Sequence, residues 1–370
     1  MRRKAAPDFL LMASIIGLLT IGIVMVYSAS AVLAEYQYGD AYYFAKRQLL
    51  FAVMGLVSMY TMMNIDYWVW RKWSGWLLAG CFLLLVIVLI PGVGLVRGGA
   101  QSWLGVGAFS IQPAEFVKLA IILFLAHMMA NHPERIPSFW RGIVPALFLS
   151  GSAFALIMLQ PDLGTGTVLM ATTVVMLYAA GSRMLHLGGL AVLGLAAFAA
   201  LIAAAPYRMQ RIIAFLDPWQ DPQGAGYQLL QSLYAIGPGG LMGLGLGKSI
   251  QKFGYLPEPQ TDFIFSILAE ELGFLGAGFV LLLFALLAWR GVRTAMYAPD
   301  FFSSMVAVGI ISMVMIQVVI NIGVVTGLLP VTGITLPFLS YGGSSLTIVL
   351  TAMGLLLNIS RHAQPFPVRL

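Results

Sequence analysis

A short polar segment, Pro257 to Asp262, stands directly before a long apolar run and ends in an acid. A carboxylate at the edge of such a run is partly removed from water, which raises its pKa toward the range of a general base. Thr261 and Asp262 are also residue types that cap the first turn of a helix. The two roles are compatible, because a capping carboxylate is held in place. Asp262 is therefore the first candidate for a catalytic residue.

Further ionisable residues lie inside apolar runs, where charges are costly and mark functional sites. Glu270 and Glu271 are adjacent in one run, and Glu115 and Lys118 share another. Residues 115 and 118 lie on one face of a helix, because positions i and i+3 are neighbours on its surface. We expect Lys118 to be the partner of Glu270 and Glu271. Together these residues form either a buried structural ion pair or a polar floor beneath a cavity.

A basic set lies outside the apolar runs, in two of the longer polar segments, and consists of Arg97, Arg208, Arg211, Lys248 and Lys252. Trp103 lies in the first of these segments. Basic groups at a membrane surface bind anionic lipid headgroups or a diphosphate. A solvated loop face is the competing interpretation of each residue. The glycine-rich stretch 237–247 before Lys248 is by itself only a weak indication of a phosphate site.

Several kinds of chemistry are excluded by what the sequence lacks. The complete G-x-x-x-x-G-K-[ST] pattern of a P-loop and the G-x-S-x-G nucleophile elbow are both absent, as is any His-x-x-His pair. The single cysteine, Cys81, lies in an apolar run, and the four histidines are scattered. The sequence therefore argues against ATP hydrolysis, a disulfide framework and a Cys- or His-based metal site.

The composition indicates which elements must position these residues. Hydrophobic residues make up 60% of the 370 residues and charged residues 9%, whereas soluble domains have about 25% charged residues. Apolar runs of the length that crosses a bilayer recur along the chain, and backbone groups in lipid favour helices. We predict an all-α, polytopic membrane protein of one domain, 1–370, with about ten spans: 9–33, 48–64, 74–90, 113–130, 142–159, 164–180, 186–204, 263–289, 303–325 and 343–359.

Two spans need comment. The first has basic residues before it and small residues after it, like a signal peptide, but its apolar run is too long for one, so we expect it to be retained. The spans on either side of Gln160-Pro161-Asp162 alternatively form a single kinked re-entrant element.

Lys and Arg gather in one set of short loops and in both tails, which places both termini in the cytoplasm. The net charge of +6 reflects these loops and does not indicate nucleic acid. Three unusually long segments, 91–112, 205–262 and 326–342, then lie outside, with the largest between spans seven and eight. Loops of such length in a compact protein are usually functional.

A series of motifs, in order along nearly the full length, resembles the SEDS family (shape, elongation, division and sporulation). The motifs are Tyr27-Ser28-Ala29-Ser30, Gln112-Pro113-Ala114-Glu115-Phe116-Val117-Lys118, Gln160-Pro161-Asp162-Leu163-Gly164-Thr165, Tyr207-Arg208-Met209-Gln210-Arg211, Gly226-Tyr227-Gln228, the segment ending at Asp262, Asn321-Ile322-Gly323, and 336–345 with Ser340 and Ser344. The segments 236–240 and 257–262 are most similar to the division and sporulation branch, of the stage V sporulation protein E type.

The resemblance implies a peptidoglycan glycosyltransferase that polymerises lipid II on the outer face of the cytoplasmic membrane. It implies that Asp262 is the essential acid and that Trp103, Ser340, Ser344 and the basic set contact the substrate. Where the family often has Arg two positions before this Trp, the chain has Gln101, and Arg97 is the candidate to supply that charge. The family further implies a single-span class B penicillin-binding protein as partner. A divalent cation, magnesium or manganese, is compatible with this chemistry, although no ligand set in the sequence demands one.

Two other functions compete with this one. A flippase for the lipid-linked precursor would need a polar path through the membrane, for which Glu115, Lys118, Glu270 and Glu271 are candidates. A membrane scaffold that recruits other wall enzymes would not need Asp262.

Overall fold

The computed structural model describes residues 6–97, 100–106 and 109–363. Each of the ten predicted spans is a helix: α1 (Phe9–Tyr38), α2 (Tyr43–Asn64), α3 (Tyr67–Val88), α4 (Pro113–Asn131), α5 (Val144–Met158), α6 (Leu163–Ala179), α7 (Met184–Ala203), α10 (Ile264–Met296), α11 (Phe301–Val325) and α12 (Gly343–Ser360). Within the described ranges, eight helices are long and apolar enough to cross a membrane, while α6 is a shorter apolar helix. The helical membrane fold is thus confirmed.

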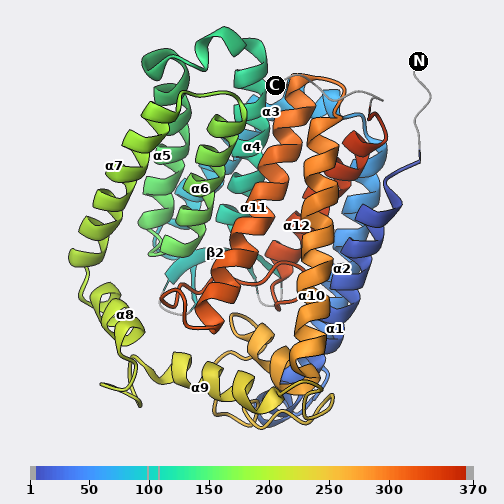
Figure 1. The fold of residues 1–370 in the computed structure, drawn as a ribbon, viewed down its shortest axis with the longest axis vertical. Helices are drawn as coiled ribbons and strands as arrows, with labels where there is room; N and C mark the ends of the chain where they lie inside the picture. The colour runs from blue at the N-terminus through green and yellow to red at the C-terminus, as the bar shows by residue number, and fades with distance from the viewer. Residues whose placement is uncertain (1–5, 98–99, 107–108, 364–370) are drawn as a thin grey trace.

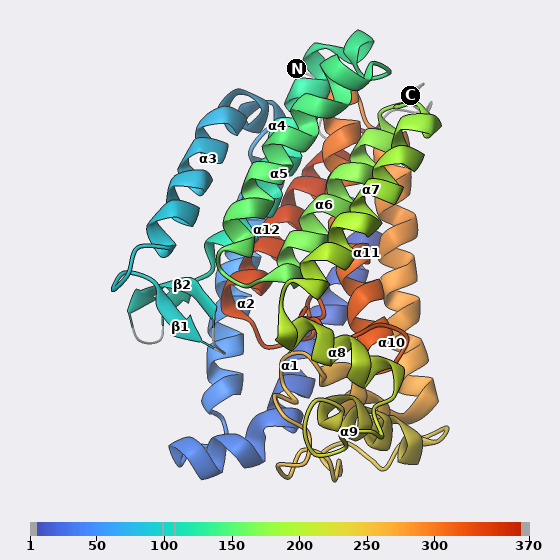
Figure 2. The ribbon, with the colours of Figure 1, turned by 90° about the vertical axis from the view of Figure 1, so that its left-hand side faces the viewer.

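The helices form a bundle whose two termini lie at the same end (Figures 1 and 2). α12 is the most enclosed span, with 78% of its apolar window buried, whereas only 6% of that of α7 is buried. Small residues permit the closest helix crossings. A Cβ added at Gly354 of α12 would lie 2.3 Å from the Met59 carbonyl oxygen of α2, so only glycine fits there.

Aspartates begin several helices. The carboxylates of Asp8, Asp66, Asp162 and Asp300 accept N–H groups in the first turns of α1, α3, α6 and α11, which satisfies donors that a helix start leaves unpaired. Asp162 thereby separates α5 from α6, and these are two helices that pack on each other rather than one continuous element.

The long segments gather at the end of the bundle opposite the termini (Figures 1 and 2). Segment 91–112 was predicted as a loop but contains a three-stranded antiparallel sheet of β1 (Leu95–Arg97), β2 (Ala100–Val106) and β3 (Phe109–Ile111). Segment 205–262 contains α8 (Pro206–Leu216) and α9 (Tyr227–Ile236), followed by the 3₁₀ turn Gly237–Gly239.

One predicted span is interrupted. In α10, Gly273 has φ 66° and ψ −166°, which breaks the helix into a short segment, 264–272, and a long one. In an unbroken helix the N–H groups of residues 274 and 275 would bond the carbonyls of 270 and 271. Here Phe274 and Leu275 donate to the carbonyls of Gly240 and Leu241, while the freed carbonyls accept from Leu244 and Gly245.

The residues that repair this break form what we call the glycine loop, residues 239–247. Gly243 has φ 79°, and a Cβ there would lie 2.1 Å from the Glu271 carbonyl oxygen. Positive φ is accessible to glycine at no steric cost. The glycine-rich sequence is therefore explained by close backbone packing on α10, and it does not need a phosphate.

Candidate active site

A cavity of about 940 Å³ is lined by residues of the three long segments and of the helices beside them. Its walls come from α1, α2, β2, β3, α4, α6 and α11, from the segments 258–262, 333–335 and 341–342, and from the start of α12. The ionisable groups that line it, apart from tyrosines, are Arg47, Glu115, Lys118, Asp162, Glu258 and Asp262. Residues from all three predicted outside segments thus meet around one space.

Asp262 lies in this wall, partly buried, and is held by its backbone. Its carbonyl accepts the Asn321 side-chain amide of α11 at 2.8 Å. The preceding carbonyl, of Thr261, accepts the Ser340 hydroxyl at 2.6 Å, and Tyr341 N–H donates to Gln260 at 2.8 Å. α10 has no side-chain cap at its start, so the capping role weighed for Asp262 is not found. Asp262 lines the cavity instead.

Burial, together with the Glu258 and Asp162 carboxylates, raises the pKa of Asp262 to about 6, while the Arg211 guanidinium acts in the opposite direction. The ionised form is disfavoured because the carboxylate has exchanged water for a poorly solvating surrounding. A base with a pKa near the working pH combines a usable basicity with a large ionised fraction.

A second polar group lines the cavity beside α4. Lys118 Nζ and Glu115 Oε1 are 2.9 Å apart, and both side chains are buried. The Gln112 amide donates to Asp162 at 3.0 Å, and the other oxygen of Asp162 caps α6 through Thr165 N–H at 2.9 Å. Burial raises the pKa of Asp162, with the bond from Thr165 acting in the opposite direction. Glu115 and Lys118, expected on one face of a helix, thus form a buried ion pair within α4 that also lies in the cavity wall.

The predicted basic set separates in the structure. Arg211 lies against a smaller pocket next to the cavity, where its Nη1 donates to the Val331 carbonyl at 3.3 Å. Lys248 is exposed and Lys252 is buried, and neither is among the described residues that line the cavity. The side chains of Arg97 and Arg208 lie outside the described residues.

Of the other predicted contacts, Trp103 lines the cavity. Ser340 and Ser344 are buried, and their hydroxyls form hydrogen bonds with backbone groups. Neither serine is among the described residues that line the cavity. Ser340 bonds Thr261 and Leu336, and Ser344 bonds Ser110 and Gln112. Both serines therefore fix the walls that carry Asp262 and the Gln112–Asp162 pair.

Comparison with known proteins identifies the family of the chain. Residues 9–365 match the family model for cell cycle proteins that covers FtsW, RodA and SpoVE. The chain belongs to the FtsW/RodA/SpoVE family. This confirms the resemblance drawn from the sequence motifs.

Relatives of this FtsW/RodA/SpoVE protein align with almost its whole length. Stage V sporulation protein E of Bacillus subtilis (strain 168) is 62% identical over 362 residues, which are 98% of this chain and 99% of that protein. The probable peptidoglycan glycosyltransferase FtsW of Geobacter sp. (strain M18) is 42% identical over 97% of this chain and 98% of its own length.

Solved structures of the family share the fold. A chain of a peptidoglycan synthase complex, studied for its coordination of polymerization and crosslinking, aligns with a TM-score of 0.78 at 32% identity and covers 96% of this chain and 98% of its own. The rod shape determining protein RodA of Thermus thermophilus aligns with a TM-score of 0.72 at 29% identity, over 96% and 97%.

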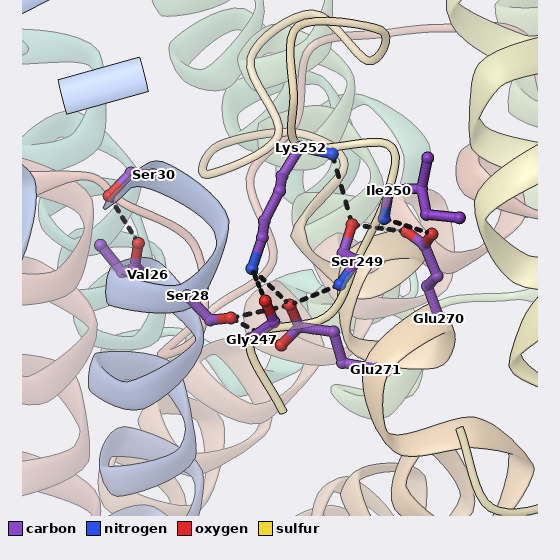
Figure 3. A network of polar contacts seen from close by, with 9 residues as sticks. All are labelled: Val26, Ser28, Ser30, Gly247, Ser249, Ile250, Lys252, Glu270 and Glu271. Carbon is purple, nitrogen blue, oxygen red and sulfur yellow. Dashed lines mark hydrogen bonds and ion pairs between the residues drawn. The ribbon is translucent and has the colours of Figure 1, made fainter. Parts of the chain in front are cut away.

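Glu270 and Glu271, the two acids of α10, belong to a polar network that is separate from the cavity (Figure 3). Glu271 accepts from Lys252 Nζ at 3.0 Å and from the Ser28 hydroxyl of α1. Glu270 accepts from the Ser249 hydroxyl at 2.5 Å and from Ile250 N–H at 2.8 Å. The predicted pairing of these acids with Lys118 is therefore wrong, because the segment 247–252 folds back over α10 and brings Lys252 to them.

Neither Glu270 nor Glu271 is among the described residues that line the cavity. Of the four residues expected to form a polar floor, Glu115 and Lys118 alone reach it. The network of Glu270, Glu271, Ser249 and Lys252 joins α1, the outer segment and the short part of α10, whose first turn directly follows Asp262.

Three residues that line the cavity were not predicted from the sequence. Arg47 was not among the candidate residues, and Gln112 belonged to a recognised motif without a role. Glu258 has φ 49°, uncommon for a residue other than glycine, and its carboxylate accepts from Gln260 at 3.2 Å. Within the described ranges, no group of three or more His, Cys, Asp or Glu is arranged to hold a metal ion, and we assign no metal ligands.

Proposed function

We propose that this protein is a peptidoglycan glycosyltransferase that joins lipid II units into glycan strands on the outer face of the cytoplasmic membrane. The observation that carries the proposal is Asp262: a carboxylate with a pKa of about 6 that lines a cavity of about 940 Å³. The Arg211 guanidinium lies close enough to act on its charge.

The reaction needs one proton transfer and one displacement. Asp262 takes the proton from the GlcNAc 4-hydroxyl of the acceptor, and that oxygen attacks C1 of the MurNAc at the end of the growing strand. The bond from C1 to the phosphate oxygen breaks with inversion, and undecaprenyl diphosphate leaves with the bonding electrons. Arg211 and Arg47 are the cations placed to offset charge that develops on the diphosphate.

The test is polymerisation of supplied lipid II by purified full-length protein, with and without a class B penicillin-binding protein. We expect Asp262→Asn to lower the rate about 100-fold to 10,000-fold, the usual contribution of a general base. Asp66→Asn, at the cap of α3, is the matched control because Asp66 does not line the cavity.

Glycan strands formed at the normal rate by Asp262→Asn would reject this mechanism. Lipid II transport and cell growth are the measurements that separate the alternatives. A flippase would transport lipid II without polymerising it, and a scaffold would support growth of cells that carry Asp262→Asn.

We further propose a class B penicillin-binding protein as partner, with its single span against α10 and α11. Phe279 and Leu282 of α10 and Val319 of α11 are large apolar side chains that the bundle leaves exposed. Cysteines at these positions, in a Cys81→Ser background, should crosslink to cysteines in the partner's span in cells. Absence of any adduct at all three would reject this placement.

The proposed orientation places both termini in the cytoplasm and the cavity outside. It is supported by the Lys and Arg content of the end that carries the termini. An impermeant thiol reagent should label Leu246→Cys in intact cells and should label Ala363→Cys only after the membrane is opened. The reverse pattern would overturn the orientation.

A further inference from the structure

A smaller pocket of about 440 Å³ lies beside the cavity, between α8, the turn at 223–225 and α9. Its lining differs from that of the cavity in charge: among the described residues that form it, Arg211 is the one ionised side chain, and no acid is present. The other lining residues are Gln210, Ala214, Phe215, Gln223, Gly224, Ala225, Tyr227, Gln228, Leu229, Pro257 and Val331.

Three primary amides converge on this pocket. Gln210, Gln223 and Gln228 line it, and no hydrogen bond joins their side-chain amides to another described residue. A primary amide offers both N–H donors and a carbonyl acceptor. This combination matches hydroxyl and acetamido groups, which also donate and accept, and it does not match the purely accepting oxygens of a diphosphate.

Two rings complete the lining. Tyr227 and Phe215 offer apolar faces beside these amides, and the C–H face of a pyranose ring packs on such surfaces. Sites for neutral polar ligands are built in this way, from apolar faces with a few placed polar groups.

The pocket adjoins the candidate base. Pro257 is in its wall and the next residue, Glu258, is in the wall of the cavity; likewise Val331 lines the pocket and Gly333 the cavity. Arg211 lines the pocket and acts on the charge of Asp262. The two spaces therefore share the wall segments 257–258 and 331–333.

We propose that this pocket is a saccharide subsite that binds an N-acetylhexosamine next to the two sugars that react at Asp262. The inference rests on the proposed glycosyltransferase function. A polymerase that keeps hold of its strand must bind sugar beyond the reacting pair, and this pocket supplies amide groups and aromatic faces for such a sugar next to the cavity that holds the base. Its loss should weaken strand binding and shorten the product.

The first experiment measures binding to the full-length protein in detergent, carrying Asp262→Asn to prevent turnover. The probes are a lipid-free tetrasaccharide of alternating GlcNAc and MurNAc, and inorganic diphosphate. We expect Gln228→Ala and Gln223→Ala each to weaken tetrasaccharide binding at least fivefold and to leave diphosphate binding unchanged. The matched controls Gln231→Ala and Gln220→Ala, neighbours that do not line the pocket, should stay within twofold.

Unchanged tetrasaccharide binding in both pocket variants would overturn the proposal, as would a selective loss of diphosphate binding, which would make the pocket a headgroup site. Thermal unfolding of each variant identifies one that fails to fold, and the second variant then decides.

The second experiment measures strand length with lipid II and the otherwise native chain. Shorter strands from Gln228→Ala than from Gln231→Ala support the subsite, and strands of equal length count against it. If the native chain makes no strands, the glycosyltransferase proposal fails, while the binding experiment still reports on the pocket.

Discussion

At the scale of single residues, Asp262 combines a fixed backbone with a poorly stabilised charge. Asn321 and the Ser340–Thr261 bond hold the main chain around it, while burial and two neighbouring carboxylates oppose ionisation of its side chain. Sites that use a general base often carry such a perturbed carboxyl group. The arrangement keeps the base in position and also keeps it basic.

A pH profile should report this carboxyl group directly. Because the ionised form is the base, polymerisation at subsaturating lipid II should rise with pH through about 6 and then level off, in line with the pKa of Asp262. Arg211→Gln removes a cation that lowers this pKa, so the rise should move to higher pH. A profile that is flat between pH 5 and 8, measured with the native chain, would contradict the assignment.

The same pKa predicts a gain in stability when the charge is removed. An acid whose pKa is raised on folding contributes stability below its unfolded pKa of 3.8, and this contribution is lost as the pH rises through about 6. At pH 7.5 Asp262→Asn should therefore raise the free energy of unfolding, by at most about 3 kcal/mol, since each pKa unit corresponds to about 1.4 kcal/mol. Thermal unfolding at pH 7.5 and 4 checks this, because the gain should shrink at the lower pH. A loss of stability at pH 7.5 would contradict it.

At the scale of elements, the break in α10 depends on glycine at both positions that meet there, Gly273 and Gly243. Gly243→Ala would place a Cβ against the Glu271 carbonyl at a positive φ. We expect it to destabilise the protein by about 2 kcal/mol or more, measured by thermal unfolding. Gly278→Ala, on the regular part of α10 with open space around it, should change stability by no more than about 1 kcal/mol. Equal effects at the two positions would show that the glycine loop is not required.

The network at Glu270 and Glu271 gives a second prediction for the same element. Lys252→Met leaves the Glu271 carboxylate buried without its cation, which typically costs about 3–5 kcal/mol. Lys248→Met, at an exposed position of the same segment, is the control and should cost less than about 0.5 kcal/mol. Adding Glu271→Gln to Lys252→Met should recover part of the loss. If Lys252→Met is as stable as the control, the network does not hold the outer segment on α10.

The existence of the spans was predictable because each depends on local composition, and the apolar runs coincide with the helices. The contacts among the long segments were not predictable, because they join residues that are far apart in the sequence. Nothing near Lys252 indicates that it reaches Glu271 rather than a substrate. Gly273 lies inside an apolar run, where its positive φ has no local signature.

At the scale of the whole molecule, the candidate site is assembled from both halves of the chain. Asp262 was predictable because one polar segment meets one apolar run, whereas the cavity also needs Arg47, Gln112 and Tyr341 from three other elements. Arg47 in particular has no distinguishing neighbours in sequence, so its place in the wall follows only from the packing of α2 beside α12.

The repair of the break in α10 has a consequence for amide exchange. Leu244 and Gly245 lie in a segment without regular secondary structure, but their N–H groups bond carbonyls of a buried helix. Amide protons exchange only when such bonds open, so these two should be retained on the timescale of α10 itself. The amides of Asp221 and Gln223, in the same outer segment, should exchange quickly. In exchange kinetics the glycine loop would behave as part of the membrane bundle, and the boundary between fast and slow protons would run through the middle of the outer segment.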